Sequence, residues 1–213
     1  NTEPAAIKNA GNVKMLGSKS IGLYGNGASL IENSGVLSSD IEGNIGIYSK
    51  GSTVSTINNS NSIMLSNSGI GIYAENAAIS NTGSITTGDQ TAVSDSIGIY
   101  AKNSVVTNTG DVKTGQDGIA FFGDNSTINI NGGNIDASKG SLVYGKNGSI
   151  INYNTADTVV SGVQPYINIE NSALNFSSPA ALTVSDNGTG ILVSGNTGTV
   201  TGNLELNLNN NAV

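Results

Sequence analysis

The chain has 213 residues with a formal net charge of −7, and only 11% of its residues are charged, against about 25% in an average globular domain. This acidic balance excludes a protein that binds nucleic acid through its phosphates, and the absence of Cys excludes disulfides and thiolate metal sites. No apolar run approaches the roughly 20 residues of a membrane span. The hydrophobic fraction of 37% is too high for a disordered chain, so we expect a narrow apolar core.

An internal repeat dominates the sequence. The string I-G-[LI]-Y occurs at 21–24, 45–48, 70–73 and 97–100, and degenerate copies follow at 119–122 and 141–144. The aromatic position therefore recurs at steps of 22 to 27 residues. A second strand-like run follows each copy. Four of the six copies are then followed by an Asn-x-Gly anchor, such as 81–83 or 108–110, and by a single apolar residue, such as Ile85 or Val112.

Within each unit the apolar spacing is two, which is typical of strands rather than helices. Strand-like runs of four to six residues are bounded by Gly and Asn, which accept turn conformations. Three short strands per 22–27 residues predict an all-β fold, a parallel β-helix of about eight to nine coils, and we expect it to be right-handed from the crossover preference of parallel strands. Residues 1–150 are regular. Degenerate coils are expected in 151–213, with strands near 166–169, 174–176, 181–184, 191–193, 199–201 and 204–208.

Stacking of equivalent positions predicts ladders of like residues. Two buried columns are expected from the first strand, Ile21, Ile45, Ile70, Ile97 and Ile119, and Leu23, Ile47, Ile72, Ile99 and Phe121. A third is expected from the second strand, Leu30, Val54, Ile79, Val106, Ile128 and Ile150. An amide ladder at a turn is expected from Asn33, Asn81, Asn108 and Asn131.

The outward face of the first strand holds the candidate binding residues. We expect an aromatic stripe of Tyr24, Tyr48, Tyr73, Tyr100, Phe122 and Tyr144, and two residues further on a charged row of Lys50, Glu75, Lys102, Asp124 and Lys146 with alternating signs. Opposite charges on neighbouring strands attract. The stripe is either a surface ladder that fixes register, or a binding face for sugar rings or partner side chains. Longer loops near 38–44, 87–96 and 154–165 offer a second place for binding, and they carry the acids Asp40, Glu42, Asp89, Asp95 and Asp157.

We do not expect an enzyme. Hydrolases built on a β-helix need carboxylates that converge on one groove, and the fifteen acidic residues are scattered along the sequence. His is absent and all eight basic residues are Lys. No metal-ligand spacing, phosphate-binding loop or nucleophile motif occurs, so we expect neither a metal nor another cofactor. An acid pair that meets across coils remains open at this point.

The repeats I-G-I-Y-[AS]-[KE]-[NG] and N-T-G-[DS]-[IV], carried most clearly by 70–85 and 97–112, resemble the passenger regions of large fusobacterial-type autotransporter adhesins. The resemblance implies a right-handed β-helix at the bacterial cell surface, anchored in the outer membrane by a C-terminal barrel that this chain lacks. The chain would be one β-helical segment, 1–213, of a longer passenger. Its partners would be a host-cell protein or glycan, another bacterium, or a second rod. A passive stalk that presents a distal binding domain, and a polysaccharide-cleaving β-helix, are the alternatives.

Overall fold

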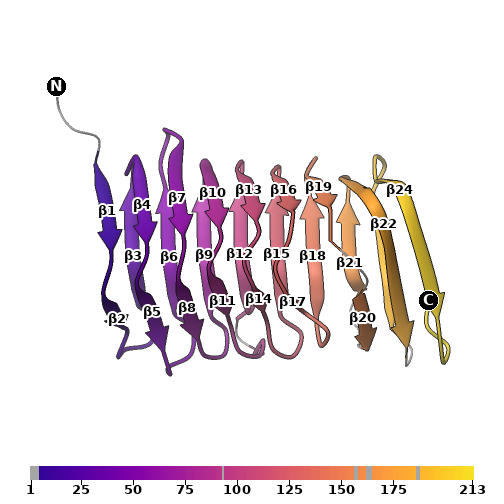
Figure 1. The fold of residues 1–213 in the computed structure, drawn as a ribbon, viewed down its shortest axis with the longest axis horizontal. Coiled ribbons are helices and arrows are strands. Elements are labelled where there is room, and N and C mark those ends of the chain that lie inside the picture. Colours follow the sequence, from indigo (N-terminus) through magenta and orange to yellow (C-terminus); the bar gives the residue numbers. More distant parts are fainter. Residues whose placement is uncertain (1–4, 93, 156–157, 162–164, 186–187) are drawn as a thin grey trace.

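The computed structural model describes residues 5–92, 94–155, 158–161, 165–185 and 188–213, and these form a right-handed parallel β-helix. Successive coils stack side by side along one rod, with the N-terminal coil at one end and the C-terminal coil at the other (Figure 1). Every pairing between named strands is parallel and joins equivalent strands of neighbouring coils. No helix that could cross a membrane occurs among these residues. The fold predicted from the repeat is therefore confirmed.

Three sheets run along the rod. Sheet C holds the I-G-I-Y strands: β3 (Ile21–Asn26), β6 (Ile45–Lys50), β9 (Ile70–Glu75), β12 (Ile97–Lys102), β15 (Ile119–Asp124), β18 (Ser141–Lys146), β21 (Pro165–Glu170) and β23 (Thr189–Ser194). Sheet A follows with β1 (Ala6–Asn9), β4 (Leu30–Asn33), β7 (Ser55–Asn59), β10 (Ala77–Asn81), β13 (Val105–Asn108), β16 (Thr127–Ile130), β19 (Ile150–Tyr153), β20 (Thr158–Ser161), β22 (Ala173–Ser185) and β24 (Thr199–Leu208). Sheet B holds β2 (Asn12–Lys14), β5 (Val36–Ser39), β8 (Ser62–Leu65), β11 (Ser84–Thr86), β14 (Val112–Lys113) and β17 (Ile135–Asp136).

The degenerate coils after residue 150 keep the rhythm but merge their strands. The runs expected at 174–176 and 181–184 belong to the single strand β22, which pairs with β19 through its first part and with β20 through its last. The runs expected at 199–201 and 204–208 likewise lie in β24. Two strands replace three in the coils β21–β22 and β23–β24, whereas the coil of β18 and β19 keeps β20 as a separate third strand.

The interior of the rod is one cluster of apolar side chains, to which all three sheets contribute. The column that begins at Leu23 is buried as predicted, and Val143 and Ile167 extend it along the same register. The column that begins at Ile21 is not a core column: Ile21 is 39% exposed, and of its members only Ile97 is buried.

The cause is the glycine in the second position of these strands. A Cβ added to Gly98 would meet the Ala120 carbonyl oxygen at 2.5 Å and the Val112 Cγ1 atom at 2.6 Å, so this position faces the core across from sheet B. Leu142 and Tyr166 occupy the equivalent position in later coils and are buried. Two consecutive residues thus point inward and the strict alternation is broken. The preceding isoleucine is therefore left on the outer face.

The third column was predicted in the wrong register at three positions. Ile79, Val106 and Ile128 are buried as expected, but their partners are Ile31, Ile57 and Ile151. Leu30 and Ile150 are each one residue away and point to the opposite face. Val54 is 71% exposed, because the connection between β6 and β7 is longer than its equivalents in neighbouring coils and Val54 lies in it.

The amide ladder exists with a different membership. Asn9, Asn33, Asn59, Asn81 and Asn108 are buried, and each donates its side-chain amide to the next side-chain oxygen at 2.7–2.8 Å, up to Asn108. Asn131 is exposed and lies outside it, since Ile130 takes the register position after Asn108. The ladder satisfies polar groups inside the turn between sheets A and B.

Candidate functional site

The predicted aromatic stripe is a stacked ladder on the outer face of sheet C. Ring centroids of Tyr48 and Tyr73 are 4.8 Å apart with planes at 4°, and those of Tyr73 and Tyr100 are 4.6 Å apart at 2°. Tyr24 and Phe122 stack on its two ends at 5.5 and 4.9 Å. In such a stack each ring covers the face of its neighbour. The inner rings therefore offer edges and hydroxyl groups to solvent, and their faces are not available to a sugar ring.

Tyr144 departs from this arrangement. Its ring meets Phe122 at 60° with centroids 5.0 Å apart, and its hydroxyl group donates to Glu170 at 2.8 Å. The next residue in the register is Asn168, followed by Leu192. The aromatic ladder thus ends at a ring whose further side is not covered by another ladder ring.

Three tyrosines of the stripe, Tyr73, Tyr100 and Tyr144, have a raised pKa that keeps their hydroxyl groups neutral. Burial, together with the hydrogen bond that Tyr73 donates to Glu75 at 2.9 Å, raises the pKa of Tyr73. Burial and the Asp124 and Glu75 carboxylates raise the pKa of Tyr100. The hydrogen bond to Glu170, with burial, raises the pKa of Tyr144. The ladder is thereby coupled to the acidic members of the charged row.

The charged row lies where it was predicted, at the ends of the sheet C strands. Lys102 is in register with both Glu75 and Asp124, and Lys146 lies 3.7 Å from Asp124 in an ion pair. The Lys50 ammonium group lies 5.9 Å from the Tyr48 ring centroid, and that of Lys146 lies 5.2 Å from the Phe122 centroid. Glu170, which the sequence prediction missed, continues the alternation of sign after Lys146.

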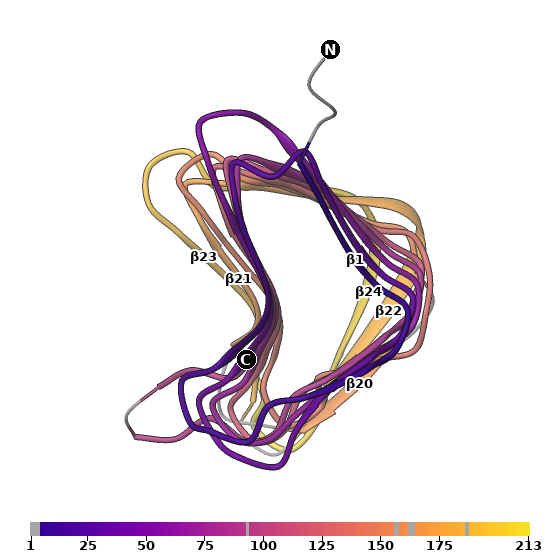
Figure 2. The ribbon, with the colours of Figure 1, turned by 90° about the vertical axis from the view of Figure 1, so that its left-hand side faces the viewer.

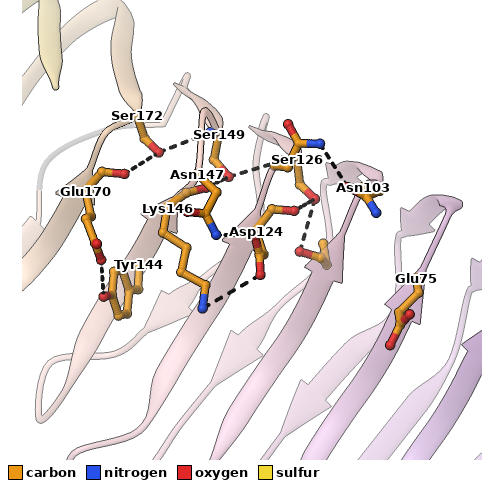
Figure 3. Close-up of polar contacts among 12 residues, drawn as sticks. Glu75, Asn103, Asp124, Ser126, Tyr144, Lys146, Asn147, Ser149, Glu170 and Ser172 are labelled. Carbon is orange, nitrogen blue, oxygen red and sulfur yellow. Dashed lines mark hydrogen bonds and ion pairs between the residues drawn. The ribbon is translucent and has the colours of Figure 1, made fainter. Parts of the chain in front are cut away.

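The turn after the charged row fixes its position. The residue that follows each strand is Asn103, Asn125 or Asn147 in successive coils, with φ between 49° and 55°, a left-handed conformation that Asn tolerates. Beyond it, hydroxyl groups cap the backbone of the preceding coil: Ser126 N–H donates to Ser149 and Ser149 N–H to Ser172 (Figure 3). Asn147 also donates to Asp124 at 2.7 Å. Asp124 is therefore held by Asn147 and Lys146 of the coil that follows it.

Seen along the rod, sheet C bends toward the interior, so its outer face is concave (Figure 2). The loop between β11 and β12 projects beside this face, at the lower left of Figure 2. A hollow of about 260 Å³ lies where the loop meets the end of the ladder. It is lined by Gln90 and Asp95 from that loop, Asp117 from the next turn, and Ile119, Phe122, Ser141, Tyr144, Pro165 and Asn168 from sheet C.

The loop acids are divided among separate places. Asp95 lines this hollow, whereas Asp40 pairs with Lys14 at 2.7 Å and Asp89 accepts from the Gln116 N–H at 2.7 Å. Glu42 lines another hollow, with Lys19 and Ser68. Asp157 is outside the described residues. Asp95 and Asp117 stand two residues before Ile97 and Ile119, which are register partners. The repeat could therefore have paired them, but the sequence prediction did not include Asp117.

Within the described ranges, no group of three or more metal-ligating side chains forms. No family model, curated protein or solved structure matches the chain. The site is therefore interpreted from its own geometry.

Proposed function

We propose that the chain is a segment of a bacterial cell-surface adhesin, a rigid β-helical rod that binds host cells or other bacteria through the outer face of sheet C. The observation that carries this proposal is the concave face itself, with its aromatic ladder, charged row and flanking loop. Binding residues concentrate on loops and faces held by a rigid scaffold. The side chains of this face are mostly half-buried rather than freely moving, so little ordering entropy opposes binding.

A passive stalk is the second candidate, and one observation favours it. The inner rings of the ladder are covered by one another, as they would be if the ladder served only to hold coils in register. An adhesin loses binding to cells when the ladder face is altered, whereas a passive stalk has no binding to lose.

Polysaccharide cleavage is less well supported by the same face. Asp95 and Asp117 do line one hollow, but Asp95 is exposed. Glycosidases require one carboxyl group whose surroundings keep it protonated for the leaving group.

The adhesin proposal is tested by measuring saturable binding of the purified chain to epithelial cells and to other bacteria. The test variant carries Tyr→Ser at Tyr48, Tyr73 and Tyr100. A matched control carries alanine at Asn58, Ser80 and Thr107, which form one register row on the outer face of sheet A. We expect the control to bind and the ladder variant not to, at temperatures where both are shown to be folded. Equal binding by both variants would contradict recognition by sheet C, and no saturable binding by the parent chain would leave the stalk. Enzymatic removal of cell-surface glycans in parallel separates a sugar receptor from a protein one.

A further inference from the structure

We propose that the hollow at the end of the aromatic ladder is a binding site for one neutral pyranose ring. This inference rests on the adhesin proposal, for which it names a ligand class. A site for a neutral pyranose requires three features in one place: an aromatic face, groups that form hydrogen bonds with the sugar hydroxyls, and a wall without cations.

The aromatic face is that of Tyr144. Rings within the ladder are covered on both sides, but the tilt of Tyr144 and the replacement of the next ring by Asn168 leave it as the terminal ring. Tyr144 and Phe122 both line the hollow, with Ile119 and Pro165 beside them. The apolar C–H face of a pyranose packs against such a surface, since an aromatic ring presents a negative face to the positive edge of C–H bonds.

The hydrogen-bonding groups come from two neighbouring coils. The Asp95 and Asp117 carboxylates accept hydrogen bonds only, and sugar hydroxyls are donors; bonds to ionised acceptors are the stronger kind. Gln90 adds an amide group at the same wall. Asn168 forms part of the wall, but its side-chain oxygen is closed off from solvent and offers no acceptor to a ligand.

The charge and the volume of the hollow restrict the class of ligand further. No lysine lines the hollow, so the two carboxylates disfavour sialic and uronic acids. The volume of about 260 Å³ lies just below the range of about 300–1,000 Å³ usual for drug-sized ligands, which fits one sugar ring better than an oligosaccharide chain.

The test measures binding of methyl glycosides of galactose, glucose and mannose to the whole chain by saturation-transfer NMR and calorimetry. Galacturonic acid and N-acetyl-arginine amide serve as anionic and cationic probes. The variants are D95N, D117N, Y144L and Y144F, with D111N as the control for charge, because Asp111 is exposed and lies in the turn before β14. Asparagine tolerates the positive φ of Asp117.

We expect at least one neutral glycoside to bind. D95N, D117N and Y144L should each weaken it about tenfold, the equivalent of one good hydrogen bond or ring contact, and Y144F and D111N should leave it unchanged. Preferential binding of either charged probe, or affinities equal in all variants, would overturn the inference. A chain that adheres to cells but binds no methyl glycoside would also overturn it while leaving the adhesin proposal intact. A chain that neither adheres to cells nor binds a methyl glycoside would contradict both the adhesin proposal and the sugar site.

Discussion

Replacing Asn59 by aspartate puts a carboxyl group into the middle of the buried amide ladder. Asn59 accepts from Asn33 at 2.8 Å and donates to the Asn81 side-chain oxygen at 2.7 Å and to the Asn61 carbonyl oxygen at 3.0 Å. In N59D the donor becomes an oxygen that faces two acceptors at a site 1% exposed. An uncompensated charge at such a site costs about 3–5 kcal/mol of unfolding free energy.

The sign of the pH dependence follows from the same contacts. The introduced carboxyl group is disfavoured as an anion, so its folded-state pKa lies above the unfolded value of about 3.9. When protonated, this carboxyl group donates one of the two hydrogen bonds that the Asn59 amide donates in the parent chain. The stability of N59D, relative to the parent chain, is therefore highest below about pH 4 and is lost as pH rises through the folded-state pKa.

The free energy of unfolding is measured by urea titration, monitored by circular dichroism, from about pH 3 to about pH 8, a range that spans the titration of a carboxyl group. N131D is the control, since Asn131 is exposed and only accepts from Asn154; it should change stability by less than about 0.5 kcal/mol. If N59D loses no more unfolding free energy than N131D, or if its loss does not change with pH, the buried amide ladder does not stabilise the fold as proposed.

Three further predictions concern sheet C and its turns. G98A should destabilise by about 1–3 kcal/mol, because the added methyl group meets the Ala120 carbonyl oxygen at 2.5 Å. G132A should be neutral in the same thermal unfolding assay, because its added methyl group meets only Thr109 atoms, at 3.8–4.0 Å. N103V should cost about 1–2 kcal/mol more than N103G, since φ is 49° there; equal stabilities would show that the turn is not strained by a branched residue. The raised pKa of Tyr73 means that the folded chain holds this proton longer than the unfolded one, so stability should fall as pH rises above about 10, and Y73F should remove that component from the tyrosinate absorbance titration.

The period, the parallel stacking and the aromatic ladder could be predicted because they depend on residues that recur at equivalent positions. The column at Ile21 was placed wrongly, because alternation assumes that every second residue points inward. Glycine fills the extra inward position in the first four I-G-[LI]-Y strands and leaves no side chain as a sign; only later coils carry one, such as Leu142 and Tyr166. Asn59 was missed because it sits in an Asn- and Ser-rich run where several asparagines fit the anchor equally well.

The candidate site was predictable only in part. The stripe and charged row follow from the repeat, but the hollow depends on a loop that occurs in one coil and brings Asp95 to Asp117. The repeat aligns Asp95 with Asp117, two residues before Ile97 and Ile119, but it does not show how the loop that carries Asp95 lies against sheet C. Stacking of the rings follows from the spacing of parallel strands, but the sequence prediction did not draw the consequence that stacked inner rings cover one another's faces.

Blocking one face of a single coil tests recognition by sheet C most directly. The chain has no cysteine, so K102C on sheet C, T107C on sheet A and K113C on sheet B each supply one thiol on successive strands β12, β13 and β14. Each is coupled to a maleimide polymer and assayed for adhesion to cells. We predict that the polymer at position 102 abolishes adhesion and that the polymers at 107 and 113 leave it unchanged. Adhesion that survives at position 102, or is lost equally at all three, would contradict recognition through the outer face of sheet C.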